Sequence, residues 1–222
     1  MAGIGTAWLI HDFAHYMAAS EELVLGTGAD YMQVLEPLKN GTILPEEVCK
    51  HIVNCYEKTY HHITNDYTQS AINLSEVGSL INNINNFATL AIDMINNNHA
   101  QVIKKIINDS RNKFTCTHFG EDESNYIDLR HFYSNMLGHI KSMRLKNNNE
   151  IALYQHSLKN ILENGLAILN KTVIANVAGK NLKKAGGIYI YFPNASIHQS
   201  FASTEFAQCT TWISFLKAFL QS

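Results

Sequence analysis

Apolar side chains recur every three or four positions along most of this chain, and this spacing is typical of amphipathic helices. The longest such patterns cover residues 77–107 and 151–178, and asparagine runs at 96–98 and 147–149 mark breaks because asparagine is a poor helix former. Residues 77–180 are therefore expected to form a helical part of the molecule. Shorter helical patterns cover residues 4–14, 31–38, 45–62, 127–140 and 204–220, and Asp128 is the predicted N-cap of the helix at 127–140.

Three short apolar segments have a different pattern and predict buried strands at residues 16–20, 70–74 and 188–192. Strands of this length that alternate with helices indicate a helix-rich α/β fold with short, mainly parallel strands covered on both faces. Three strands make a small sheet, so we expect part of the domain to be missing from this sequence. Residues 112–125 follow neither pattern and are predicted to form a surface loop.

The composition is that of one folded domain, residues 1–222. Apolar types make up 46% of the chain, which is enough for a core, and only three residues are proline. The formal net charge is −2 and the lysines and arginines are scattered, so neither nucleic acid nor anionic lipid is an expected partner. No apolar run approaches the roughly 20 residues of a membrane span, and the first residues lack the pattern of a secretory signal. The cytoplasm is therefore the default compartment.

Four cysteines are spread along the chain, at 49, 55, 116 and 209. Their spacing resembles neither a disulfide framework nor a zinc ribbon, and buried free thiols are the expected state. Cys55 and Cys209 are predicted to face a core. Cys116 and His118 are close in sequence, but catalytic pairs usually meet from different segments, so this pair is a weak candidate for nucleophilic chemistry.

A weak metal-site alternative comes from two histidines. His11 and His15 stand four positions apart in the predicted helix 4–14, a spacing that places two imidazoles on one helix face. Asp12 follows His11 where a zinc peptidase motif has glutamate. A third ligand would have to come from Glu57, His61 or His62, and nothing in the sequence places these nearby. No cofactor is expected otherwise.

Several segments, in order along nearly the whole chain, resemble those of clostripain-type cysteine peptidases. They are YMAASEE (16–22), GTG (26–28), SAINL (70–74), IDL (127–129), GIYIYFP (187–193), FA (206–207) and TW (211–212). The resemblance implies a caspase-like α/β sandwich and a cysteine–histidine dyad, in which a thiolate attacks the peptide carbonyl and a histidine handles the proton. In the family the cysteine lies just before the helix that precedes the ASEE strand. Both dyad residues would then precede Met1.

The same resemblance implies a substrate groove and indicates its residues here. The candidates for this groove are Ser20, Glu21, Glu22, Thr27 and Asp30. The family commonly has aspartate at the position of Thr27, facing a basic residue of the substrate, and tryptophan at the position of Ala29. Threonine cannot pair with a cation, so a preference for basic residues is in doubt even with a restored nucleophile.

Glu21 and Glu22 also have a non-catalytic interpretation. A pair of carboxylates is the requirement for glycoside chemistry, but neighbours on a strand point to opposite faces and cannot flank one bond. We then expect one carboxylate to cap the strand end and the other to meet solvent.

These residues favour a truncated or degenerate clostripain-like domain, the C-terminal portion of the fold, without peptidase activity of its own. The alternative is one portion of an active cysteine endopeptidase whose histidine and cysteine lie upstream. A metal-binding helical protein using His11 and His15 is the weaker alternative. Peptides or proteins are the expected partners, and a homodimer or association with a missing upstream half would cover an exposed sheet edge. Members of the resembled family are often secreted, which leaves the compartment open.

Overall fold

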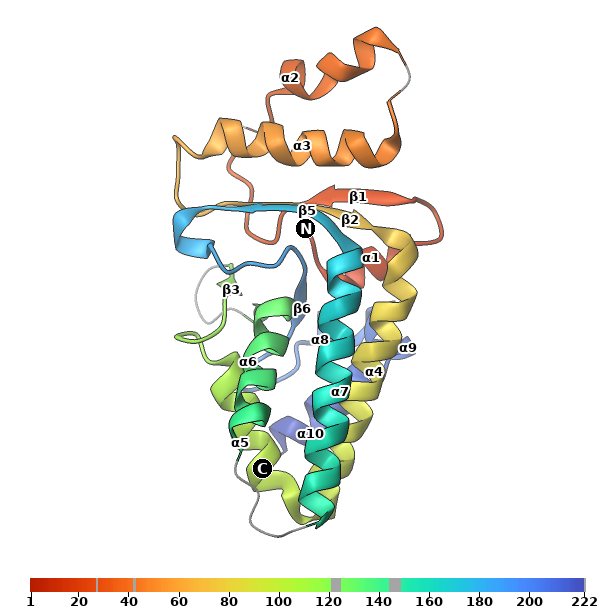
Figure 1. The fold of residues 1–222 in the computed structure, drawn as a ribbon, viewed down its shortest axis with the longest axis vertical. Coiled ribbons are helices and arrows are strands. Elements are labelled where there is room, and N and C mark those ends of the chain that lie inside the picture. The colour runs from red at the N-terminus through yellow and green to blue at the C-terminus, as the bar shows by residue number, and fades with distance from the viewer. Residues whose placement is uncertain (27, 42, 121–124, 144–148, 222) are drawn as a thin grey trace.

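The computed structural model describes residues 1–26, 28–41, 43–120, 125–143 and 149–221. A small sheet lies across one end of the molecule, one long helix covers its outer face, and a bundle of helices extends from its inner face (Figure 1). The α-helices are α1 (Ile4–Ile10), α2 (Tyr31–Leu35), α3 (Pro45–Tyr60), α4 (Val77–Met94), α5 (Ala100–Arg111), α6 (Leu129–Ser142), α7 (Asn149–Thr172), α8 (Gln199–Ala202), α9 (Glu205–Cys209) and α10 (Trp212–Leu220). Short helical turns are η1 (Glu36–Asn40), η2 (Leu74–Glu76), η3 (Ile95–His99, a π-helix) and η4 (Lys180–Leu182).

Six strands form two antiparallel sheets in the described part of the chain. The first has the order β1 (Tyr16–Ala19), β2 (Thr68–Asn73), β5 (Val173–Ala178), and the second the order β3 (His118–Phe119), β4 (Tyr126–Asp128), β6 (Tyr189–Tyr191). The prediction of mainly parallel strands is therefore wrong. The chain leaves β2 along α4 and returns along α7 directly into β5 (Figure 1). Helices α4 to α7 are therefore inserted between β2 and β5, which pair antiparallel as the two strands of a hairpin do.

Residues 1–3 connect the two sheets. The amide of Ala2 donates to the carbonyl oxygen of Ser20 at 2.7 Å, and the carbonyl oxygen of Ala2 accepts from the amide of Tyr189 at 3.0 Å. Gly3 forms a parallel bridge with Tyr189, and a Cβ at Gly3 would lie 2.6 Å from the Tyr189 ring. The absence of a side chain at Gly3 thus permits the close approach of the two sheets.

One large core fills the helical bundle. Phe87 of α4 contacts the rings of Phe132, Tyr133, Trp212 and Phe215, with centroids 5.7 to 6.3 Å apart, and all five side chains are fully buried. A separate small cluster of three tyrosines attaches α3 to the outer face of the first sheet. It consists of Tyr56, Tyr60 and Tyr67, with Val177 packed against it.

Several helix and strand predictions are confirmed. Strands occupy β1, β2 and β6 where the short apolar segments predicted them, and α3 begins at Pro45 with two glutamates in its first turn. Asp128 is the N-cap of α6, as predicted, and its carboxylate accepts from the amide of His131 at 2.5 Å. The long pattern at 77–107 is interrupted at η3, which contains the predicted asparagine break.

Other boundaries differ from the prediction. The first helix ends at Ile10 rather than Ala14, and the helix predicted to reach residue 178 ends at Thr172. The β-branched residues Val173, Ile174 and Val177 lie in β5 instead, where pairing with β2 accommodates them. Residues 112–125 are not simply a surface loop, because β3 lies within them and Cys116 and Phe119 are buried.

None of the helices in the described ranges combines the length and the apolar content that crossing a membrane requires.

Candidate functional site

The end of β1 is held by a buried threonine from β2. The hydroxyl oxygen of Thr68 accepts the amides of Glu21 at 2.9 Å and Glu22 at 3.0 Å, and it lies 3.0 Å from the hydroxyl of Ser20. Ser20 donates its only hydroxyl hydrogen to the carbonyl oxygen of Glu22 at 2.7 Å, so Thr68 is the donor in the contact between the two hydroxyls. This network fixes the backbone of the segment Ser20–Glu22.

Glu21 points into the protein and meets a second buried carboxyl group. Its Oε2 accepts the amide of Gly187 at 2.9 Å, its Oε1 is buried without a hydrogen-bond donor among the described residues, and the carboxyl group of Asp128 is its neighbour. Asp128 accepts the amides of Gly186 and His131. The two carboxyl groups therefore join the end of β1, the start of α6 and the turn before β6.

Protonation of one of the two buried carboxyl groups would remove the electrostatic repulsion between them. Burial, the first cause, and the charge of Asp128 raise the pKa of Glu21 well above its ordinary value. Burial also raises the pKa of Asp128, although its hydrogen bonds with Glu21, Gly186 and His131 favour the charged form. Glu21, whose pKa is raised well above its ordinary value, is the member of the pair that retains a proton to higher pH, and the positive charge of Arg130 nearby lowers the pKa of both groups.

The remaining groove candidates in the described ranges, Glu22 and Asp30, do not join the buried pair of Glu21 and Asp128. The carboxylate of Glu22 accepts the amide of Leu23 at 2.7 Å and lies 3.4 Å from the amide of Gly120. Asp30 is the N-cap of α2, and its hydrogen bonds with Gln33 are the first causes that lower its pKa. The structure thus brings Ser20, Glu21 and Glu22 together around Thr68. Thr27 lies outside the described residues.

Two neighbouring hollows lie beside this strand end and share the rings of Tyr126 and Tyr189; we call them together the tyrosine groove. The smaller hollow, of about 110 Å³, is lined by Met1, Glu21, Glu22, Leu23, Phe119, Gly120, Tyr126 and Tyr189. The larger, of about 500 Å³, is lined by Gly3, Ile4, Gly5, Thr6, Leu9, Asn125, Tyr126, Tyr189, Tyr191, His198, Ser200, Phe201, Thr204, Glu205 and Phe206.

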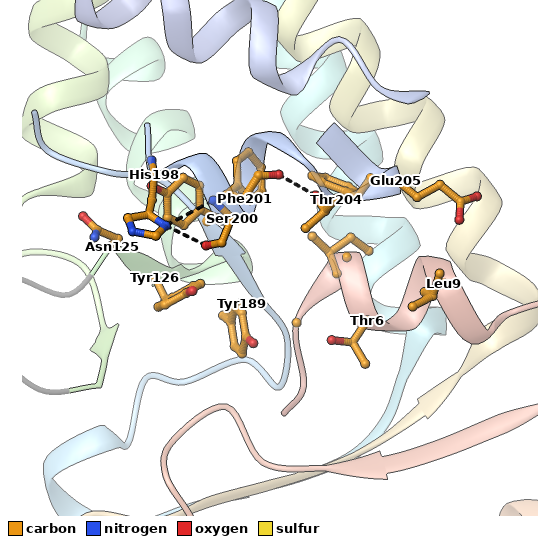
Figure 2. A pocket seen from close by; sticks show the side chains of 15 residues that line it. Thr6, Leu9, Asn125, Tyr126, Tyr189, His198, Ser200, Phe201, Thr204 and Glu205 are labelled. Carbon is orange, nitrogen blue, oxygen red and sulfur yellow. Dashed lines mark hydrogen bonds between the residues drawn. The ribbon is translucent and has the colours of Figure 1, made fainter. Parts of the chain in front are cut away.

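Figure 2 shows the larger hollow of this groove. The two tyrosine rings lie on one side, His198, Ser200 and Phe201 lie opposite, and Thr6 and Leu9 of α1 close a further side. The rings of Tyr126 and Tyr189 meet edge to face with centroids 5.1 Å apart. Such a wall offers apolar contact area with a few polar groups at its rim, which suits an extended chain segment or a small aromatic ligand.

A serine–histidine pair in the groove has a structural role. Nδ1 of His198 lies 2.6 Å from the hydroxyl of Ser200 and also accepts the amide of Ser200 at 3.2 Å, so the imidazole caps the short helix α8. A general base must have its lone pair available for the proton it removes. Because the cap occupies Nδ1, we do not assign a catalytic role to His198.

None of the four cysteines lines the tyrosine groove. Cys116 is buried, its sulfur is 3.8 Å from the carbonyl oxygen of Asp128, and burial raises its pKa to about 12. Its sequence neighbour His118 donates from Nε2 to the carbonyl oxygen of Arg111 at 2.7 Å instead of pairing with the thiol. Cys209 is exposed, so the prediction that it faces a core is wrong, whereas Cys55 is buried as predicted.

Cys55 does approach a histidine, which the sequence analysis did not identify. Its sulfur lies 3.2 Å from Nε2 of His51, one turn earlier on α3. The same Nε2 lies 2.8 Å from the carbonyl oxygen of Gln33, and this contact requires a hydrogen on Nε2. His51 therefore has no lone pair at that atom to accept the thiol proton, and burial raises the pKa of Cys55 further. The pair lacks the properties of a nucleophile and its base.

The structure does not have the geometry that the predicted metal site at His11 and His15 requires. Helix α1 ends before His11, so His11 and His15 do not share a helix face. Nδ1 of His11 lies 2.5 Å from the carbonyl oxygen of Trp8, and the carbonyl of His15 accepts the amide of Leu74. Among the described residues, no group of three His, Cys, Asp or Glu side chains is arranged to hold a metal ion.

The sequence pattern does not reveal the partners of Glu21 or the tyrosines that line the groove. Asp128 was expected only as a helix cap, and Tyr189 and Tyr191 only as residues of a buried strand. One local signal is available in the sequence: Glu21, Asp128 and Gly187 lie in segments of the family resemblance, and Gly186 directly precedes one of them. Backbone amides of small residues such as glycine are suited to donate to a buried carboxyl group, but the sequence alone does not identify which carboxyl group they contact.

Comparisons with known proteins give one family and a set of solved structures. The model of the Clostripain family matches residues 1–219. A clostripain from Bacteroides thetaiotaomicron ATCC 29148, in complex with the peptide inhibitor BTN-VLTK-AOMK, is 17% identical with a TM-score of 0.58, and the match covers 95% of this chain and 82% of that chain. At this identity the likeness shows a shared fold.

Two further structures support the same fold. A secreted C11 cysteine protease from B. thetaiotaomicron, iotapain, is 18% identical with a TM-score of 0.57, and the match covers 95% of this chain but 52% of that chain. A B. fragilis cysteine protease is 16% identical with a TM-score of 0.56, with 96% and 83% covered. No curated protein matches this chain at a significant level.

Proposed function

Because this chain belongs to the clostripain family, we propose that residues 1–222 form a peptide-binding part of the family fold and do not hydrolyse peptides on their own. The observation that carries this proposal is the tyrosine groove, which lies beside the Ser20–Glu22 strand end and contains none of the four thiols. A relative with the same fold binds a peptide inhibitor. We thus interpret the groove as a truncated or degenerate peptidase site with Glu21 and Glu22 in its wall, while Ser20 and Asp30, which are outside this lining, and Thr27 remain proposed contacts of the substrate.

The alternative proposal is that the chain is one portion of an active cysteine endopeptidase. Residue 2 makes backbone hydrogen bonds to both neighbouring sheets, and Met1 lines the smaller hollow. If the natural protein contains residues before Met1, they adjoin a residue that already lines this hollow together with Glu22 and Tyr189. That position suits a nucleophile better than the position of any thiol in the chain, and it supports an upstream source of the dyad.

The test is a peptidase assay combined with a binding assay. Fluorogenic peptides ending in Arg, Lys or Ala should show no turnover with this chain, while labelled peptides of the same sequences should bind and raise fluorescence anisotropy. Turnover that a thiol-reactive inhibitor abolishes would overturn the first proposal. Serine substitutions at Cys49, Cys55, Cys116 and Cys209 would then identify the nucleophile, and the same assay on a chain extended upstream tests the alternative.

Substitution of a groove tyrosine tests where the peptide binds. Tyr126 is 38% exposed at the shared wall of the groove, so Tyr126→Ala should weaken peptide binding about fivefold through lost ring contact. Tyr31→Ala is the matched control, because Tyr31 is 69% exposed on α2 and lines neither hollow. Equal losses in the two variants would place the peptide outside the groove.

A further inference from the structure

A hollow on the other side of β3 has a lining of opposite character to the tyrosine groove. It has a volume of about 640 Å³ and lies between the end of α5, β3 and the turn after β6; we call it the α5 pocket. Its lining consists of Asn108, Arg111, Asn112, Lys113, Phe114, His118, Gly120 and Asn194. The ionisable side chains in this set are an arginine, a lysine and a histidine, and no described carboxylate lines the pocket.

Arg111 is the buried cation of the α5 pocket. It is 4% exposed, and its guanidinium carbon lies 4.4 Å from the ring centroid of Phe192. One terminal nitrogen donates to Oδ1 of Asn194 at 2.6 Å and the other to the carbonyl oxygen of Phe192. Its Nε has no partner in the described part of the chain, and each of these partners is neutral.

The charge of Arg111 persists at neutral pH. Burial lowers the pKa of Arg111 only to about 10. A buried charge without a counter-ion is unfavourable, because neutral acceptors do not fully replace the water that the guanidinium loses. An anion beside the guanidinium would relieve this cost.

A purely structural role for Arg111 explains only part of the arrangement. Its two hydrogen bonds tie α5 to the end of β6, which accounts for burial of the side chain. They do not account for the two amides at the pocket. Asn194 uses its oxygen for Arg111, and Asn112 uses its oxygen to accept the amide of Phe114 at 2.9 Å. Both side chains therefore present NH₂ donors, and Lys113 adds an ammonium group.

We propose that the α5 pocket binds a small oxyanion, held by Arg111, Lys113 and the amide nitrogens of Asn112 and Asn194. Guanidinium and ammonium groups with neutral donors between them are the chemistry that recognises phosphate and carboxylate oxygens. Glu121, Asp122 and Glu123, which follow Gly120 in sequence, lie outside the described residues and are not part of the proposed site. None of these four proposed ligands lines the tyrosine groove, although Gly120 borders both the α5 pocket and the smaller hollow of that groove.

The test measures thermal unfolding and calorimetric binding with inorganic phosphate, and with sodium chloride at matched ionic strength. Phosphate should bind saturably and raise the melting temperature, whereas chloride should not, because screening alone depends only on ionic strength. Succinate in place of phosphate distinguishes the two oxyanion classes: saturable binding of either one supports the site, and the tighter one identifies its class.

Two substitutions assign the binding to the pocket. Lys113→Gln should weaken phosphate binding about threefold, because the ammonium group is exposed to solvent. Lys39→Gln removes the same charge from exposed η1 and should leave the affinity unchanged. Arg111→Lys should weaken binding about tenfold, since an ammonium cannot replace the guanidinium fork. Lys113→Gln keeps the test decisive if Arg111→Lys does not fold.

Two results would overturn the proposal. One is the absence of saturable binding of both phosphate and succinate, which would mean that the positive charges of the pocket are already neutralised. The other is an equal loss of affinity in Lys113→Gln and Lys39→Gln, which would show a general charge effect of the surface.

Discussion

At the scale of single residues, the buried pair Glu21–Asp128 shows most clearly what sequence reasoning reaches and where it ends. Glu21 and Glu22 do point in different directions, but strand alternation is not the reason, because β1 ends at Ala19 and both residues follow it. The position of Asp128 before an apolar helix correctly predicted an N-cap. The meeting of these two carboxyl groups depends on how the two sheets are joined at Ala2 and Tyr189. Such a contact between distant segments has no local pattern in the sequence.

This pair predicts a pH dependence of stability. Because the pKa of Glu21 is raised in the folded state, the folded chain retains a proton that the unfolded chain loses near the ordinary value of 4.5. The folded state then binds more protons, and the free energy of unfolding falls as the pH rises from there through the raised pKa. Glu21→Gln keeps a donor to Asp128 without titrating, so its stability should fall less over this range.

Urea denaturation at a series of pH values measures the effect. Glu22→Gln serves as the control, because Glu22 is only partly buried and bonds to the neighbouring amide of Leu23. The control should keep the pH dependence of the unmodified chain. An unchanged slope in Glu21→Gln would show that Glu21 is ionised in the folded state and that Asp128 carries the proton instead.

At the scale of elements, hydrophobic periodicity located most helices but not where one of them changes into a strand. The apolar spacing continues from α7 into β5 without interruption, and only the β-branched residues after Thr172 signal the change. Pairing of β5 with β2 determines that this segment is a strand, since the pairing provides hydrogen-bond partners for backbone groups of residues 173–178. The antiparallel direction follows from the same connection and could not be read from strand patterns alone.

Close packing of α7 against α4 and α6 gives a prediction for a glycine. A Cβ at Gly165 would meet Oδ1 of Asn83 and the ring of Tyr133, which are both buried. Gly165→Ala should therefore destabilise the fold by about 2 kcal/mol despite the higher helix propensity of alanine. Gly138→Ala in α6 is the matched control, because no atom lies within 4 Å of a Cβ there.

Chemical denaturation of the two variants separates packing from propensity. Gly138→Ala should be neutral or stabilising by up to about 1 kcal/mol. A stabilising effect of Gly165→Ala would mean that α7 can move away from α4 at low cost, and that the packing of the bundle at this point is loose.

At the scale of the whole molecule, exposed apolar side chains gather in residues 23–44. They are Leu23, Val24, Leu25, Tyr31, Met32, Leu35, Leu38 and Leu44, each more than 40% exposed. The expectation of a homodimer, or of association with an upstream half, concerns the edge of the sheet at β1 and stays a prediction, and the exposed apolar residues after β1 are a further candidate contact. Sedimentation velocity over a range of concentrations should show self-association, and Met32→Glu should reduce it. A monomer at all concentrations would contradict the homodimer.

The arrangement of the cores also predicts how the molecule unfolds. One continuous core extends from Ala2 to Phe219 and includes both ends of the described chain, so residues 1–222 should unfold as a single domain. Helix α3 is attached mainly through the separate tyrosine cluster, and α2 has no buried residue. Amide hydrogen exchange should therefore be fastest in α2, intermediate in α3 and limited by global unfolding in α4 and α7.

Two measurements together test this order. Fluorescence of the buried Trp212 and far-ultraviolet circular dichroism should give one coincident unfolding transition, and exchange rates should rank the helices as above. Separate transitions would divide the helical part 77–180 from the first sheet as its own unit. Slower exchange in α3 than in α7 would mean that the sheet layer, which borders the tyrosine groove, opens at a higher free energy than the helical bundle and is the most stable part of the fold.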